Sequence, residues 1–158
     1  MKKILIAIDE SKGSLKAVEH AGQQYAGTKD LHITLFHVLP NLPTTFWDDG
    51  HVLTKREMAD RKKVIAKWLD NQKLRLDPLF KGAIEILTKR GISRQQIETK
   101  SVSETEDIAE SILDEAKDGG HQVLVMGRNS YSQGERIILG SVTAKIINLG
   151  AGITVSVV

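Results

Sequence analysis

The feature that most restricts the fold of this chain is the alternation of short apolar runs with longer segments of helical periodicity. The runs have the length and composition of strands buried on both faces, and they are rich in isoleucine, leucine and valine. In the segments between them, apolar residues recur every three or four positions, as in a helix with one buried face. Strands that alternate with helices favour a parallel sheet with helices on both of its faces. The predicted strands are residues 3–8, 33–39, 97–102, 123–126 and 153–158.

Turn and capping residues set the predicted boundaries of the helices. Residues 53–75 have an apolar side and a basic, exposed side, which predicts one helix. A second helix is predicted from about Leu79 to Gly91, because Gly91 suits a C-terminal cap. Ser103 and Glu106 have the spacing of a capping box, so the next helix is predicted to begin there.

Length and composition limit the class of protein and its partners. The chain has 158 residues, and we expect residues 1–158 to form a single domain. Hydrophobic residues make up 41% and charged residues 27%, as in ordinary soluble globular proteins. Lysine and arginine number 22 against 20 aspartates and glutamates, and aromatic residues reach 4%, so no nucleic-acid partner is expected. No stretch approaches the roughly 18 apolar residues of a membrane span, so no membrane partner is expected.

The first residues and the lack of cysteine indicate a cellular location. The apolar run after Lys3 stops at Asp9, which is too short for the hydrophobic region of a signal peptide and suits a first strand better. The sequence contains no cysteine, which excludes disulfide and thiolate chemistry and fits a reducing compartment. We therefore expect a cytoplasmic protein.

Two turns with the chemistry of a ligand site are predicted to meet at one edge of the sheet. Ligands of doubly wound sheets bind outside the carboxyl ends of strands where the strand order reverses, which here selects Asp9 and Gly127. Gly140 and Ser141 begin a predicted short helix, whose free N–H groups and positive dipole end suit a phosphate. The spacing alone leaves a structural interpretation equally open. In that interpretation Gly127 makes a tight turn, Ser141 caps the helix and Asp9 belongs to the turn after the first strand.

The segment from Gly127 to Ser141 resembles the nucleotide loop of the universal stress proteins. Their pattern is a glycine, two residues, a second glycine, nine residues, and then a glycine followed by serine or threonine. Here Gly127 is followed after two residues by Ser130, in place of the second glycine, and after nine more by Gly140 and Ser141. The resemblance extends to the family's opening strand with its aspartate, its second strand and its fourth strand, at residues 3–9, 35–38 and 123–127.

The resemblance implies a fold and a ligand. The fold class is α/β, a five-stranded parallel doubly wound sheet of the flavodoxin-like or adenine-nucleotide-hydrolase-like type, with strand order 3-2-1-4-5. The ligand is ATP or a related adenine nucleotide, AMP or ADP, with Mg²⁺ or Mn²⁺ carried by its phosphates. Residues after the first two strands border the adenosine, whereas amides and hydroxyls at the start of the last helix hold the phosphates. The implied site residues are Ala7, Ile8, Asp9, Val38, Met126, Gly127, Ser130, Gly140, Ser141, Val142 and Thr143.

Functions of three classes are weighed against each other. The leading prediction is a universal stress protein that binds an adenine nucleotide and acts as a nucleotide-responsive stress or regulatory protein. The alternative is a homodimeric protein–protein adaptor with a vestigial nucleotide pocket. The third is an enzyme, but no P-loop lysine, catalytic base or nucleophile is in place, so at most slow ATP hydrolysis is expected. The five histidines show no metal-ligand spacing, and no metal-binding or catalytic residue is predicted.

The last apolar run predicts a way for two chains to associate. Residues 153–158 form a predicted strand at one edge of the sheet, and an exposed apolar edge invites pairing with another chain. The resemblance implies the same arrangement, since members of the family form homodimers through this strand. We therefore expect a homodimer.

Overall fold

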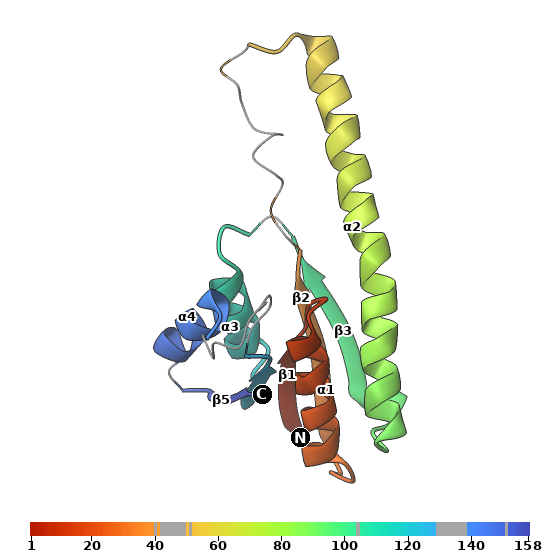
Figure 1. Cartoon of the computed structure of the whole chain (residues 1–158), viewed down its shortest axis with the longest axis vertical. Coiled ribbons are helices and arrows are strands. Elements are labelled where there is room, and N and C mark those ends of the chain that lie inside the picture. Colours follow the sequence, from red (N-terminus) through yellow and green to blue (C-terminus); the bar gives the residue numbers. More distant parts are fainter. Residues whose placement is uncertain (40, 42–49, 51, 104, 129–138, 151) are drawn as a thin grey trace.

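The computed structural model describes residues 1–39, 41, 50, 52–103, 105–128, 139–150 and 152–158. Within these residues the chain forms one five-stranded sheet in the order β3-β2-β1-β4-β5, and every strand is parallel to its neighbours (Figure 1). The predicted fold class and strand order are confirmed. The strands are β1 (Lys2–Ala7), β2 (Leu31–Val38), β3 (Ile97–Val102), β4 (Val123–Met126) and β5 (Thr154–Val157).

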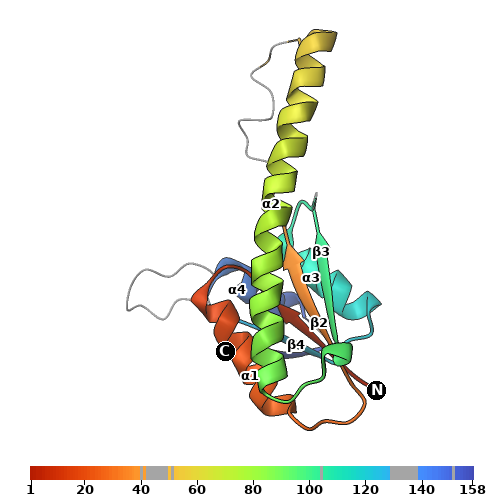
Figure 2. The ribbon, with the colours of Figure 1, turned by 90° about the vertical axis from the view of Figure 1, so that its right-hand side faces the viewer.

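Helices cover both faces of the sheet (Figures 1 and 2). α1 (Lys12–Tyr25) and α2 (Lys55–Lys89) lie on one face, α3 (Ile108–Asp118) and α4 (Ser141–Leu149) lie on the other, and a 3-10 helix, η2 (Arg94–Gln96), precedes β3. These two layers follow from the alternation of side chains along buried strands. In β1, Ile4 and Ile6 pack against α1 and α2, whereas Leu5 packs against α3 and α4.

α2 is one continuous helix of 35 residues, so the prediction of two separate helices is wrong. Pro78 lies inside it, and proline removes one backbone donor and usually breaks a helix. Here Leu76 before the proline and Ala83 after it are both buried, so packing on both sides holds a single helix. The first half of α2 extends well beyond the end of the sheet (Figures 1 and 2). Although α2 is long, neither it nor any other described helix is apolar enough to cross a membrane.

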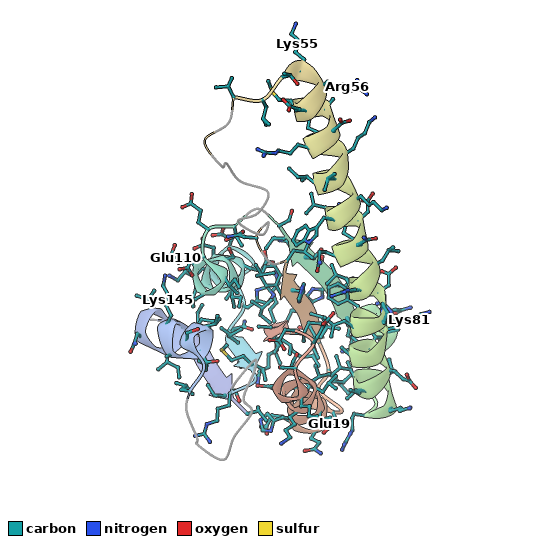
Figure 3. All side chains as sticks on the ribbon, turned by 45° about the horizontal axis from the view of Figure 1, so that its top comes forward. Glu19, Lys55, Arg56, Lys81, Glu110 and Lys145 are labelled. Carbon is teal, nitrogen blue, oxygen red and sulfur yellow. The ribbon has the colours of Figure 1, made fainter. Side chains whose placement is uncertain are left out.

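α3 begins later than the capping-box spacing predicts, so the prediction of Ser103 as its cap is wrong. The cap is Asp107, whose carboxylate accepts a hydrogen bond from the Glu110 N–H at 3.0 Å. Lys145 of α4 contacts this cap, because its ammonium group pairs with Asp107. The same group lies 3.1 Å from the Glu110 carboxylate (Figure 3). The hydrogen bond from Lys145 lowers the pKa of Asp107. A long-range ion pair, which the local spacing does not reveal, therefore accompanies the start of α3 at Asp107.

His121 is a buried histidine that ties α3 to the sheet. The residue is 7% exposed. Nδ1 lies 3.2 Å from the Glu115 carbonyl oxygen and Nε2 lies 3.0 Å from the Thr34 hydroxyl. Because a carbonyl only accepts, Nδ1 donates, and in the neutral ring Nε2 accepts from the Thr34 hydroxyl. Burial lowers the pKa of His121, against a smaller opposing contribution from Glu115.

Acidification is therefore expected to destabilise the fold through His121. Above its unfolded pKa of about 6.5 the ring is neutral in both states, and its contribution to stability is complete. Below that pH the unfolded chain binds a proton that the folded chain resists. The free energy of unfolding then falls by about 1.4 kcal/mol per pH unit until the lowered folded pKa is reached. Urea unfolding at several pH values between 7.5 and 5 measures this loss, and His121→Gln, which cannot titrate, should flatten it. An equally steep loss in the variant would contradict the assignment.

Candidate functional site

A cavity of about 460 Å³ opens at the carboxyl edge of the sheet. It lies where the strand order reverses, outside the ends of β1 and β4, and it extends across the end of β2 to α2. The volume falls within the range of small-molecule sites, about 300–1,000 Å³. The position is that of ligand sites in doubly wound sheets.

Asp9 organises the turn that leads from β1 into α1. One oxygen of its carboxylate accepts a hydrogen bond from the Ser11 N–H at 2.8 Å, and its own N–H donates to the Ser14 hydroxyl at 2.9 Å. Ser11 is the N-cap of α1 and accepts from the Ser14 N–H at 3.1 Å. Asp9 thus has the turn role that the structural interpretation gives it. Within the described part of the chain, its second carboxylate oxygen makes no hydrogen bond, and the residue lines the cavity.

Gly127 lies at the end of β4, in contact with the start of α1. A Cβ atom at this position would lie 2.6 Å from the Gly13 carbonyl carbon and 2.9 Å from the Ser14 nitrogen, so only glycine fits without movement of backbone. The carbonyl oxygen of Gly127 accepts a hydrogen bond from the Thr143 hydroxyl at 3.2 Å. Gly127 therefore lies between the first turn of α1 and the first turn of α4.

The start of α4 is held against the end of β4. The Gly140 N–H donates to the Arg128 carbonyl at 3.1 Å, which holds Gly140 next to the end of β4. Gly140 is the N-cap of α4 and offers no side chain to its first turn, and the first bond within the helix runs from the Ala144 N–H to the Gly140 carbonyl. The N–H groups of the three residues between them have no partner inside the helix. They add to the positive end of the helix dipole beside Gly127.

The hydrogen bonds at the start of α4 determine which donors remain available to a ligand. The resemblance implies that the amide of Gly140 and the hydroxyl of Thr143 contact phosphate, but both groups donate within the protein. The amides of Ser141, Val142 and Thr143 are the donors that the start of α4 leaves over. Ser141 is exposed, and Val142 and Thr143 line the cavity.

Most of the predicted site residues come together in this cavity. Gly140 and Ser141 lie at the start of α4, next to its lining, and Ser130 lies outside the described residues. The predicted residues that line the cavity are Ala7, Ile8, Asp9, Val38, Met126, Gly127, Val142 and Thr143.

Other lining residues were missed by reasoning from sequence. Phe36, His37 and Leu39 flank Val38 at the end of β2, and the rule that ligands bind at carboxyl ends could have found them. The missed residues of α2 had no comparable signal, because two helices were predicted where α2 is one. The missed residues that helices contribute are Ser14 of α1, Gln72, Arg75, Leu76 and Leu79 of α2, and Ile108 and Ile112 of α3.

The cavity has two chemically different ends. At the end near α4 lie the polar β1–α1 turn and the first amides of α4, which have no partner among the described residues. At the end near α2, Val38, Leu39 and Leu76 are buried apolar residues. The charged residues of the lining are Asp9, Glu10 and Arg75. No group of three or more histidine, aspartate or glutamate side chains that could hold a metal ion occurs in the described ranges. Fold and cavity together define a doubly wound protein with a site suited to a nucleotide.

Comparison with protein families identifies the chain more closely. The model described as the universal stress protein family matches residues 1–152. The chain therefore belongs to the universal stress protein family. No curated protein matches its sequence.

Solved structures of universal stress proteins share the fold. UspA from Lactobacillus plantarum is 18% identical with a TM-score of 0.69, over 99% of this chain and 97% of that chain. The universal stress protein from Archaeoglobus fulgidus in complex with dAMP is 18% identical with a TM-score of 0.58, over 99% and 97% of the two chains. A family member from Arabidopsis thaliana with AMP bound is 16% identical with a TM-score of 0.60, over 100% and 91%. At these identities the likeness establishes the fold.

Proposed function

We propose that the protein binds ATP, ADP or AMP in this cavity and acts as a nucleotide-responsive stress or regulatory protein. The observation that carries the proposal is the start of α4, where amides without a partner among the described residues lie beside Gly127, at one end of a cavity that the apolar Val38, Leu39 and Leu76 line at the other. Related proteins in complex with dAMP and with AMP support the choice of an adenine nucleotide. The absence of cysteine suits a cytoplasmic protein.

The two ends of the cavity give the nucleotide its orientation. Phosphate oxygens lie against the amides of Ser141 and Val142, where the helix dipole favours negative charge. The free oxygen of Asp9 accepts hydrogen bonds from the adenosine. The base packs at the apolar end, next to Val38 and Leu76. Ser130 remains a predicted phosphate ligand, and Mg²⁺ or Mn²⁺ is carried by the phosphates.

The proposal is tested by thermal unfolding of protein purified without added ligand, with millimolar ATP, ADP, AMP or no nucleotide. At one hundred times the dissociation constant, a ligand adds about 2.7 kcal/mol to stability. For a chain of this size that corresponds to a rise of roughly 5–10 °C in Tm. No rise with any of the nucleotides would contradict the proposal.

Two substitutions at Ser141 distinguish the contribution of its amide to nucleotide binding from that of its hydroxyl. Ser141 is the first residue of α4, where proline is well tolerated, and the ψ of 151° at Gly140 suits a residue before proline. Ser141→Pro therefore removes the amide donor and the hydroxyl with the helix intact, whereas Ser141→Ala removes only the hydroxyl. Loss of a bond to a charged group weakens binding by roughly 10–100-fold, so Ser141→Pro should bind far more weakly than Ser141→Ala. Equal binding by the two variants would show that the Ser141 amide does not hold phosphate.

A protein–protein adaptor with a vestigial pocket is the second candidate function. The observation that favours it is the negative charge of Asp9 and Glu10 in the cavity lining, which opposes the binding of a triphosphate. In that case the protein binds no nucleotide in the thermal unfolding experiment and yet associates with a protein partner. Any ATP hydrolysis is slow in either case, because the sequence offers no catalytic base or nucleophile in place.

We also propose that two copies of the chain associate through β5. This strand is the last in the order β3-β2-β1-β4-β5 and pairs on one side with β4, which leaves its other side as a sheet edge. An apolar edge strand is a template for pairing with a second chain.

A further inference from the structure

His37 occupies the end of β2 and faces the α1 and α2 side of the sheet. Its neighbours Phe36 and Val38 belong to the core beneath α3 and α4. Side chains alternate along a strand, so His37 lies on the opposite face, the face that Leu35 buries against α1 and α2. His37 lines the cavity there together with Gln72 of α2.

One hydrogen bond fixes the tautomer of the His37 ring. Nδ1 lies 2.7 Å from the carbonyl oxygen of Ile8, at the end of the adjacent strand. A carbonyl oxygen only accepts, so Nδ1 carries the proton and donates. In the neutral ring, Nε2 is then left with a lone pair and acts as an acceptor.

The Nε2 atom of His37 has no partner among the described residues and is not fully buried. Within the described part of the chain, the bond to Ile8 is the one hydrogen bond that this ring makes. No fully buried side-chain nitrogen or oxygen among the described residues lacks a partner, so the unpaired Nε2 is not fully buried. Since the ring is only partly exposed and lines the cavity, an acceptor of defined orientation is presented to a ligand.

His37 lies at the end of the cavity that the base of a nucleotide would occupy. The amides at the start of α4 lie beside β4, whereas β2 is two strands away across β1, a separation of about 10 Å. A nucleotide with its phosphates at α4 therefore extends its base toward β2 and α2. The apolar Leu39 and Leu76 line the same end and suit the faces of a flat base.

We propose that His37 determines the base specificity of the site by accepting a hydrogen bond from the exocyclic amine of adenine. Adenine carries a donor at its 6-position, where guanine carries a carbonyl acceptor. Hypoxanthine, the base of IMP, also carries a carbonyl there. If such a base occupied the site, its 6-carbonyl oxygen and Nε2 of His37 would face each other as two acceptors, and neither would be paired. Nucleotides with a 6-carbonyl are therefore rejected. Gln72 lines the same part of the cavity and offers an amide to the edge of the base. This inference rests on the proposed function, the binding of an adenine nucleotide.

The test is the affinity for AMP and for IMP, measured by calorimetry with wild-type protein and two variants. His37→Asn places an amide N–H near the position of Nδ1, so it retains a donor to Ile8 and loses the acceptor at the tip of the ring. His37→Gln places an amide oxygen near the position of Nε2 and loses the donor to Ile8. Wild-type protein is expected to prefer AMP over IMP by about tenfold. His37→Asn should bind both nucleotides equally, and His37→Gln should keep a preference for AMP.

The ratio of the two affinities separates recognition from a merely structural role, because damage to the fold weakens AMP and IMP alike. His32→Phe is a control, since His32 lies on the same strand outside the cavity lining and pairs with Glu98. It should leave the ratio unchanged. An unaltered preference for AMP in His37→Asn, or equal binding of AMP and IMP by wild-type protein, would overturn the inference and leave the proposed function standing. Binding of neither nucleotide by wild-type protein would overturn the proposed function, and the inference with it.

Discussion

Replacing Gly127 with alanine is expected to lower the free energy of unfolding by about 2–3 kcal/mol, at the upper end of the usual cost of overpacking. The added Cβ would lie 2.6 Å from the Gly13 carbonyl carbon, 2.8 Å from its oxygen and 2.9 Å from the Ser14 nitrogen. All three are backbone atoms of the α1 start, so no flexible side chain can move aside. The end of β4 and the first turn of α1 must separate, which also widens the cavity between Asp9 and Gly127.

Thermal and urea unfolding measure this loss, and a Tm lower by roughly 5–10 °C is expected. Gly82→Ala is the matched control, because a Cβ at Gly82 in α2 meets no atom within 4 Å. There the same substitution should raise stability by about 0.5–1 kcal/mol, since glycine in a helix interior is unfavourable. If Gly127→Ala unfolds like wild-type protein, the close approach of β4 to α1 is not a constraint on this position.

The sheet was predictable from sequence because its strands are buried on both faces. A strand such as β4 is a continuous apolar run between glycines and polar residues, and this pattern has few other structural meanings. The alternation of such runs with helices then implies a parallel sheet, and the resemblance to the family supplied the strand order that the structure confirms. Burial of the sheet on both faces and the order of its connections leave few possible topologies for such a chain.

The helix boundaries were less predictable because distant contacts decide them. Local rules predict a break before Leu79, since Pro78 removes a donor, but burial of Leu76 and Ala83 against the body of the protein keeps α2 continuous. Likewise, local spacing favours Ser103 as the cap of α3, whereas the ion pair with Lys145 accompanies a cap at Asp107. In α2 the energy of tertiary contacts exceeds the local preference.

The residues of the candidate site also fall into two groups, those that a local pattern predicts and those that only distant contacts bring to the cavity. Residues at strand ends, such as Asp9 and Gly127, were predictable because parallel strands bring their carboxyl ends to one edge. Gln72 and Arg75 reach the cavity only because α2 crosses the end of β2 without interruption, and nothing near them in the sequence signals this. The role proposed for His37 depends on a tautomer fixed by the Ile8 carbonyl, a contact between two strands that only the fold creates.

Proline at Val155 is expected to convert the proposed homodimer into a monomer. The N–H groups of Thr154, in β5, and of Val158, just after it, donate to the carbonyl oxygens of Gln122, just before β4, and of Met126, in β4, at 3.2 and 3.0 Å. Backbone groups alternate in direction along a strand, so the N–H of Val155 points away from β4, to the open edge. Proline there removes a donor from the proposed interface and none from the bonds to β4. In a twofold symmetric dimer the substitution acts twice, once in each chain.

Light scattering coupled to size-exclusion chromatography measures the molar mass of each variant at micromolar concentration. Wild-type protein is expected at twice the mass of the 17.5 kDa chain, and Val155→Pro at the mass of one chain. Val155→Thr keeps the N–H and the shape of the side chain, so it should remain a dimer. Comparing the two variants distinguishes the effect of the edge hydrogen bond from that of the packing of Val155 against the α3 and α4 core. A wild-type monomer would argue against any dimer, and a folded Val155→Pro dimer would move the interface away from β5. Melting of Val155→Pro shows whether the pairing with β4 survives, because loss of that pairing would lower its Tm well below that of Val155→Thr.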